Sequence, residues 1–193
     1  MNYINIFGAI SGSSTRNNYL KFHEILSFML KQKVVIIMGS KNDLDFANSI
    51  SGMLKEFEVK HEYEVASAHK TPKHLLEILK KNEESEADIV YITVAGLSDA
   101  LSGVVAGFTR YLVIACPPDA EKYGWSKVFS SAMTPKGVAV SFVLKPENAA
   151  LAAVKILALS NPSLRKKFDE YRRKMEQEVI KAGEEVKRGS TSK

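Results

Sequence analysis

From residue 33 onward, runs of apolar residues alternate with stretches of helical spacing, and this pattern predicts a parallel α/β sheet. Val34–Met38 is an unbroken apolar run rich in β-branched residues, which is typical of a strand buried on both faces. Strands are predicted at 34–38, 61–65, 89–94, 112–115 and 138–143, and helices at 44–57, 72–82, 100–109, 125–132 and 146–159. These short alternations predict a doubly wound three-layer α/β/α sandwich with a five-stranded parallel sheet.

The two ends of the chain differ from this repeating body. Residues 1–32 predict a loop rich in Ser, Asn, Gly and Thr, followed by an amphipathic helix over 19–31. This extension is either a dispensable product of an upstream gene start or an added helix that packs on the body or on a neighbouring subunit. We therefore divide the chain into an N-terminal extension at 1–32, a central domain at 33–160, and a C-terminal helix with a frayed tail at 161–193.

The C-terminal helix carries a narrow apolar seam on an otherwise charged surface. Its apolar residues recur at spacings of three and four: Leu164, Phe168, Tyr171, Met175, Val179, Ala182 and Val186. The helix either lies on its own domain or docks on another subunit. We favour the second interpretation because so thin a stripe covers little core, and we expect residues 189–193 to be frayed.

Composition and charge narrow the classes of function. The chain of 193 residues is long enough for one domain with a core, and its 45% hydrophobic and 25% charged content is ordinary. The net charge is +5, and residues 162–193 hold ten Lys and Arg against six Asp and Glu, so most of the excess lies there. Basic residues do not form a stripe with interleaved aromatics, which argues against nucleic-acid binding.

The single cysteine, Cys116, excludes an internal disulfide and a cysteine-rich metal site. It also fits a reducing compartment. We find no apolar run of membrane-spanning length, and the N-terminus lacks the basic start and apolar block of a secretory signal. These features predict a cytoplasmic protein without a membrane partner.

The stretch from Ser67 to Pro72 joins a predicted strand to a predicted helix. Thr71 is expected to be the helix N-cap, and Pro72 suits the first helical position. The turn between the predicted strand and this helix carries the imidazole of His69 next to the ammonium of Lys70. Ligands of α/β sheets bind at this carboxyl edge, and helix N-termini favour anions. The stretch is therefore either part of a site or a surface turn with incidental polar residues.

Two further turns leave the same predicted edge. The first runs from Gly39 to Asp43, where Ser40, Asn42 and helix-terminal N–H groups suit a phosphate and Asp43 suits ribose hydroxyls. The second, 96–99, again connects a strand end to a helix. Both turns are alternatively explained as ordinary helix caps.

Other candidate chemistry is weaker. His23 lies in the N-terminal extension, and His61 begins a strand. His74, at the outer side of a helix start, is expected to be solvated. No set of His, Cys, Asp and Glu has metal-ligand spacing, and no nucleophile-elbow motif is present.

Four segments in this order resemble the PurE family of purine biosynthesis. They are Met38–Asp43, Ser67–Pro72, Ala95–Gly96 and Pro146–Ala150. The resemblance runs from about residue 33 to residue 159. It implies a flavodoxin-like sheet, a catalytic role for the central domain, and aminoimidazole ribonucleotide as the substrate.

The family has two classes, and three features resemble the class that carboxylates aminoimidazole ribonucleotide directly with carbon dioxide. Lys70 follows the histidine where the mutase class usually has Arg, the third turn is short and lacks a second His, and Cys116 precedes two prolines. Leu97 and Asp99 depart from that class, which commonly has Arg and Asn there, and Asn42 stands where Ser is usual. An N-carboxyaminoimidazole ribonucleotide mutase and a diverged nucleotide-binding relative therefore stay as alternatives.

The resemblance implies a role for each candidate residue. An unperturbed imidazole titrates near pH 6.5, so His69 is expected to act as general acid and base. Ser40 and Asp43, with Asn42, would hold the phosphate and ribose, and Lys70 would attract the phosphate or the new carboxylate. The ring and carbon dioxide would be oriented by Ser67, Gly96 and Ser98. The chemistry needs no cofactor or metal, and family members are homo-oligomers, commonly octamers.

Overall fold

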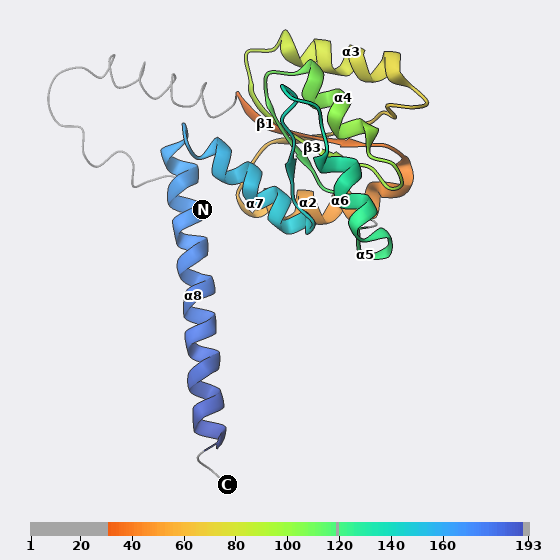
Figure 1. The fold of residues 1–193 in the computed structure, drawn as a ribbon. Helices are drawn as coiled ribbons and strands as arrows, with labels where there is room; N and C mark the ends of the chain where they lie inside the picture. The colour runs from red at the N-terminus through yellow and green to blue at the C-terminus, as the bar shows by residue number, and fades with distance from the viewer. Residues whose placement is uncertain (1–30, 119, 191–193) are drawn as a thin grey trace, which may run out of the picture. The chain divides into compact units, whose positions relative to one another are not determined.

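The computed structural model describes residues 31–118 and 120–190, and its five strands form one parallel sheet in the order β2-β1-β3-β4-β5 (Figure 1). The strands are β1 (Gln32–Met38), β2 (His61–Val65), β3 (Asp88–Val94), β4 (Leu112–Ala115) and β5 (Ser141–Phe142). From β1 the chain crosses first to β2 on one side and then to β3 on the other, which is the flavodoxin-like doubly wound arrangement. The predicted fold class is therefore confirmed.

The helices follow the predicted ranges closely at most of their ends. They are η2 (Lys41–Asp43), α2 (Leu44–Glu56), α3 (Pro72–Glu83), α4 (Ala100–Phe108), α5 (Ala120–Tyr123), α6 (Trp125–Ala132), α7 (Pro146–Leu157) and α8 (Pro162–Ser190). The short helices η2 and α5 are the two that the apolar pattern did not predict, because a single turn contains too few residues to show a period.

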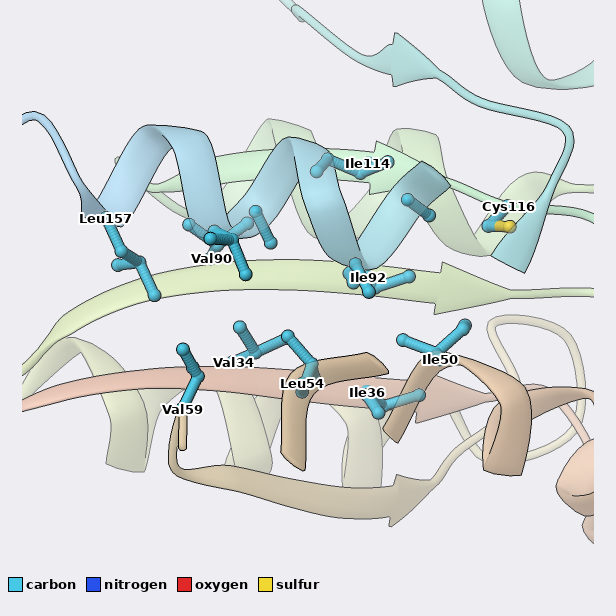
Figure 2. Packing of buried hydrophobic residues seen from close by; sticks show 14 of the residues in the cluster. Val34, Ile36, Ile50, Leu54, Val59, Val90, Ile92, Ile114, Cys116 and Leu157 are labelled. Carbon is cyan, nitrogen blue, oxygen red and sulfur yellow. The ribbon is translucent and has the colours of Figure 1, made fainter. Parts of the chain in front are cut away.

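Two helical layers cover the sheet, as the side chains of β1 show. Val34 and Ile36 belong to a buried cluster with α2 and α7, whereas Val35 and Ile37 belong to a second cluster with α3 and α4. Figure 2 shows the first cluster, in which Ile50, Leu54 and Leu157 lie among side chains of β1 and β3. Burial on both faces explains why the β1 sequence is a continuous apolar run rather than an alternating one.

Strand β5 is much shorter than the predicted 138–143. The backbone N–H of Val138 donates to the carbonyl of Pro135 at 3.1 Å, and the Thr134 hydroxyl donates to the carbonyl of Val138 at 2.6 Å. Gly137 has a φ of 97°, a conformation that L side chains rarely adopt. A turn at 136–137 therefore leads into irregular chain at 138–140, and the prediction of the extent of this strand was wrong.

The beginning of α8 packs on its own domain. Leu164 is buried, and the Phe57 ring centroid lies 6.0 Å from that of Phe168 and 5.3 Å from that of Tyr171. The Asn161 side-chain carbonyl accepts a hydrogen bond from the Leu164 N–H at 3.0 Å, which caps the helix start. The interpretation that this helix lies on its own domain therefore holds for its first ten residues.

The later part of the seam is exposed. Val179 and Val186 are 74% and 73% exposed, and Met175 is 41% exposed. The helix continues through Gly189 to Ser190, so the expected fraying from residue 189 was placed too early, and residues 191–193 lie outside the described range. None of the described helices is both long enough and apolar enough to cross a membrane.

Residues 1–30 also lie outside the described range, so the predicted loop and helix of the N-terminal extension stay predictions. The described residues from Gln32 onward form one compact unit.

Candidate active site

The turns that follow β1, β2 and β3 enclose a cavity of about 500 Å3 at the carboxyl edge of the sheet. These three strands are neighbours, so parallel pairing brings their carboxyl ends together. All eight residues predicted from the sequence line this cavity: Ser40, Asn42, Asp43, Ser67, His69, Lys70, Gly96 and Ser98. A volume of this size is typical of sites for small molecules.

The first turn is held by its own polar side chains. The Ser40 hydroxyl accepts a hydrogen bond from the Asn42 N–H at 3.2 Å, and the Asp43 carboxylate accepts one from the Ser40 N–H at 3.1 Å. This reciprocal pair is a capping box, so the alternative explanation of the turn as a helix cap is confirmed. The two roles are compatible, because both side chains also line the cavity and the Ser40 hydroxyl still has a proton to donate.

The second turn, at residues 67–71, is stabilised by hydrogen bonds among its own residues, and one of them involves the hydroxyl of Thr71. The Ser67 N–H donates to the Thr71 Oγ1 at 2.9 Å, and the Lys70 N–H donates to the Ser67 Oγ at 3.2 Å. Thr71 does occupy the N-cap position of α3, but its side chain makes no capping hydrogen bond to the helix. The predicted N-cap position of Thr71 is therefore confirmed, although its hydroxyl stabilises the turn that carries His69 and Lys70 rather than the first turn of α3.

The charged and titratable groups of this turn are open to a ligand. His69 and Lys70 are both exposed at the cavity, and neither side chain has a hydrogen bond or ion pair to another described residue. His74, by contrast, lies outside the cavity, and its ring Nδ1 is 3.7 Å from a carboxylate oxygen of Glu77. The expectation that His74 is solvated is confirmed.

In the third turn, Asp99 acts as a structural cap. Its buried carboxylate accepts hydrogen bonds from the Ser102 N–H at 3.0 Å, the Ser102 hydroxyl at 2.6 Å and the Ser131 hydroxyl at 2.5 Å. Asp99 does not line the cavity, whereas Gly96 and Ser98 do. The negative charge that departs from the family pattern is thus held behind the turn, in a hydrogen-bonded position that caps α4.

Sequence reasoning missed the α6 residues that contact this turn, among them one charged side chain. Lys127 of α6 is only 1% exposed, and its ammonium donates to the backbone carbonyls of Ala95 and Leu97 at 2.6 Å each and to that of Gly96. From the sequence alone, a lysine on a short helix is expected to be exposed to solvent, and Lys127 belongs to no recognised motif. Only the tertiary position of α6 shows that this charge lies against the wall of the cavity.

Metal ligands do not gather in the part of the chain that the structure describes. There, no three His, Cys, Asp or Glu side chains are placed so that they could hold one ion.

Comparison with known proteins matches residues 33–178 to the family described as AIR carboxylase. A phosphoribosylaminoimidazole carboxylase from Archaeoglobus fulgidus is 46% identical over 80% of this chain and 85% of the relative. An N5-carboxyaminoimidazole ribonucleotide mutase from Methanocaldococcus jannaschii is also 46% identical, over 80% of this chain and 97% of the relative. The crystal structure of Treponema denticola PurE has a TM-score of 0.78 at 36% identity, covering 81% of this chain and 99% of that chain.

The fold and the cavity define a doubly wound α/β protein with a cavity of small-molecule size at the carboxyl edge of its sheet. The chain belongs to the AIR carboxylase (PurE) family of purine biosynthesis, as its motifs indicated. Relatives named as carboxylase and as mutase match equally well in identity, so membership of the family does not choose between the two reactions.

Cys116 follows β4 at the same edge of the sheet but does not line the cavity. Its side chain is fully buried. Burial, and to a smaller extent the negative charge of Glu147, raises the pKa of the Cys116 thiol to about 12. The thiol is therefore protonated at neutral pH, and it has the character of a small apolar core residue.

We predict that the native protein reacts very slowly with thiol reagents at pH 8. An ordinary cysteine is roughly a quarter thiolate at that pH, so the raised pKa should slow labelling by roughly a thousandfold. Labelling followed by mass spectrometry, with the urea-unfolded chain as control, measures this. A native rate near that of the unfolded chain would contradict the assigned burial.

Proposed function

We propose that this protein carboxylates 5-aminoimidazole ribonucleotide with carbon dioxide to give 4-carboxy-5-aminoimidazole ribonucleotide. The observation that carries the proposal is the meeting of three polar turns in one cavity, where the imidazole of His69 makes no hydrogen bond to any other described residue. The Archaeoglobus fulgidus and Treponema denticola relatives bear the name of this carboxylase, which supports the choice.

The substrate itself supplies the nucleophile. Its aminoimidazole ring is an enamine, so the electron-rich ring carbon attacks carbon dioxide and a carbon–carbon bond forms. The product of addition carries both a hydrogen and a carboxylate on a tetrahedral carbon. Loss of that proton restores the aromatic ring, and His69 is the base that accepts it and the acid that returns it in the reverse direction. The reaction consumes no ATP and needs no cofactor or metal.

The first two turns suit the sugar phosphate. Ser40, Asn42 and Asp43 lie at the N-terminal side of α2, where backbone N–H groups and the helix dipole favour an anion. The Asp43 carboxylate would accept hydrogen bonds from the ribose hydroxyls. Lys70 adds a mobile positive charge for the phosphate or for the new carboxylate.

The remaining predicted residues would orient the reacting atoms. Ser67 lies at the base of the turn that carries His69, and Gly96 and Ser98 line the opposite wall of the cavity. The ring held between these two turns would present its carbon to carbon dioxide on one side and to the imidazole on the other. Holding the reactants in this geometry removes much of the entropic barrier.

The runner-up reaction is the mutase, for which the 46% identical Methanocaldococcus jannaschii relative is named. Both reactions would use the same nucleotide site and the same histidine, and they differ in the source of the carboxylate. Lys70 and the short third turn, which lacks a second histidine, favour the carboxylase. A third alternative is a diverged protein that binds a nucleotide without catalysing either reaction.

The proposed role in purine biosynthesis implies a cytoplasmic location.

We predict that His69→Asn lowers kcat by about 10²–10⁴-fold while the dissociation constant of the nucleotide changes little. Asparagine keeps a polar side chain of similar reach but cannot carry a proton at neutral pH. Steady-state kinetics and calorimetry measure the two effects, and His74→Asn provides a matched control outside the cavity. Retained turnover in His69→Asn would overturn the assignment of the general base.

The source of the carboxylate separates carboxylase from mutase. We expect unlabelled aminoimidazole ribonucleotide and isotopically labelled bicarbonate, without ATP, to give a product that carries the label. Freshly made N-carboxyaminoimidazole ribonucleotide, supplied in a parallel reaction, tests the alternative. If product forms only from the N-carboxylated nucleotide and stays unlabelled, the protein is a mutase.

We also propose that a second copy of this chain covers the exposed seam of α8, as part of a homo-oligomer. Met175, Val179 and Val186 continue the same apolar stripe that Leu164 and Phe168 bury against their own domain. An exposed apolar stripe of this kind on a charged helix is typical of helix association.

We expect Val179→Glu to shift the protein to smaller species in sedimentation experiments, raising the subunit dissociation constant by at least about tenfold, because association would bury a charge. Gln177→Glu adds the same charge on the opposite side of α8 and should leave the assembly intact. A monomeric wild-type protein, or equal effects of the two substitutions, would contradict this proposal.

A further inference from the structure

One face of α6 holds the third turn of the active site from behind. Lys127, Ser130 and Ser131 are spaced by three and four residues, so they share a side of the helix. The Ser130 hydroxyl accepts a hydrogen bond from the Asp99 N–H at 2.7 Å, and the Ser131 hydroxyl donates to the Asp99 carboxylate. None of these three side chains lines the cavity. They therefore support the third turn from the side that faces away from the cavity.

Lys127 makes the central contact of this support. An ammonium has three N–H donors, and here three consecutive carbonyls, those of Ala95, Gly96 and Leu97, accept from it. Its side chain is almost fully buried, so the charge is paired with backbone dipoles rather than with water. Such an arrangement fixes the direction of three successive peptide groups at once.

The direction of those carbonyls determines the direction of the adjoining amides. Every described peptide bond is trans, and in a trans peptide the N–H points opposite to the C=O. The N–H groups of Gly96, Leu97 and Ser98 therefore point away from the ammonium. Within residues 31–118 and 120–190, the structure records no hydrogen bond from these three N–H groups.

We propose that Lys127 is a positioning residue, which holds the third turn so that the N–H groups of Gly96, Leu97 and Ser98 form an anion-binding concavity for the carboxylate that the reaction creates. The identity of that anion rests on the proposed function. The residues that bear these amides line the cavity, and their turn follows β3, whereas the turn of His69 follows β2 on the other side of β1. Successive backbone N–H groups are a recognised binding element for anions, and donors fixed in advance need no reorganisation during the reaction.

Asp99 fits the same arrangement. Its carboxylate is occupied by Ser102 and Ser131 on the far side of the turn, so it leaves the amide groups unhindered. The cavity side of the turn then presents N–H donors, and the positive charge of Lys127 stands behind them. Leu97, whose side chain is 73% exposed, contributes through its backbone alone.

A merely structural role for Lys127 makes a different prediction from a positioning role. If the ammonium only stabilises the fold, its removal lowers the melting temperature and affects all ligands of the cavity alike. If it positions the amides, its removal weakens the carboxylated nucleotide selectively, because the nucleotide without a carboxylate does not use this concavity.

The experiment compares the binding of 5-aminoimidazole ribonucleotide and of its 4-carboxylated product by calorimetry. We expect Lys127→Met to weaken the product by about 10- to 100-fold, as for the loss of hydrogen bonds to a charged group, and to change the binding of the uncarboxylated nucleotide less than threefold. Lys127→Arg keeps the charge and should recover part of the loss. Lys136→Met, at an exposed lysine outside the cavity, should bind both nucleotides as the wild type does. Equal weakening of both nucleotides by Lys127→Met, or none, would overturn the proposal.

A second measurement on the wild-type protein does not depend on whether the variant folds. In hydrogen exchange followed by mass spectrometry, peptides that cover 95–99 should be protected more by the carboxylated nucleotide than by the uncarboxylated one. Equal protection by the two would contradict the amide concavity. A wild-type protein that binds neither nucleotide would be a separate result, because it would contradict the proposed substrate and not the concavity. A mutase would still bind the carboxylated nucleotide, which is also its product, and is identified by the labelling experiment instead.

Discussion

The parallel pairing of β2, β1 and β3 is the constraint on which the site depends. Three consecutive strands of the chain are neighbours in the sheet, so the turns that follow them leave the same edge. Each turn alone is a short polar connection with an unremarkable cap. Together they enclose one cavity, which is lined by a helix start, an imidazole and the backbone of the third turn. The helices on both faces bury every residue of β1 from Val34 to Met38 and thereby fix this alignment.

The polar residues of the site are held by short-range hydrogen bonds that also build the turns. Ser40 and Asp43 cap each other's backbone, and Ser67 and Thr71 close the turn that carries His69. Such local bonds fix the backbone without engaging the imidazole. A site of this kind is preorganised, because ordering of its backbone is completed on folding rather than on binding.

The sequence predicted most of the fold because the apolar runs are strong and the helices begin at marked residues such as Pro72 and Pro146. All eight candidate residues proved to line one cavity, since strand ends in a parallel sheet locate an edge without further information. Lys127 could not be found in this way, because its burial depends on the packing of α6 against a turn about thirty residues earlier in the chain. The short β5 escaped prediction for a similar reason, as the turn at Gly137 has no counterpart in the apolar pattern.

The proposed reaction requires the base and the nucleotide to meet in this cavity. A crystal structure of the protein with 5-aminoimidazole ribonucleotide bound tests it most directly. We expect the phosphate beside the turn of Ser40 and Asp43 and the reactive ring carbon within about 3.5 Å of a nitrogen of His69. A ring bound elsewhere, or one held beyond reach of that imidazole, would contradict it.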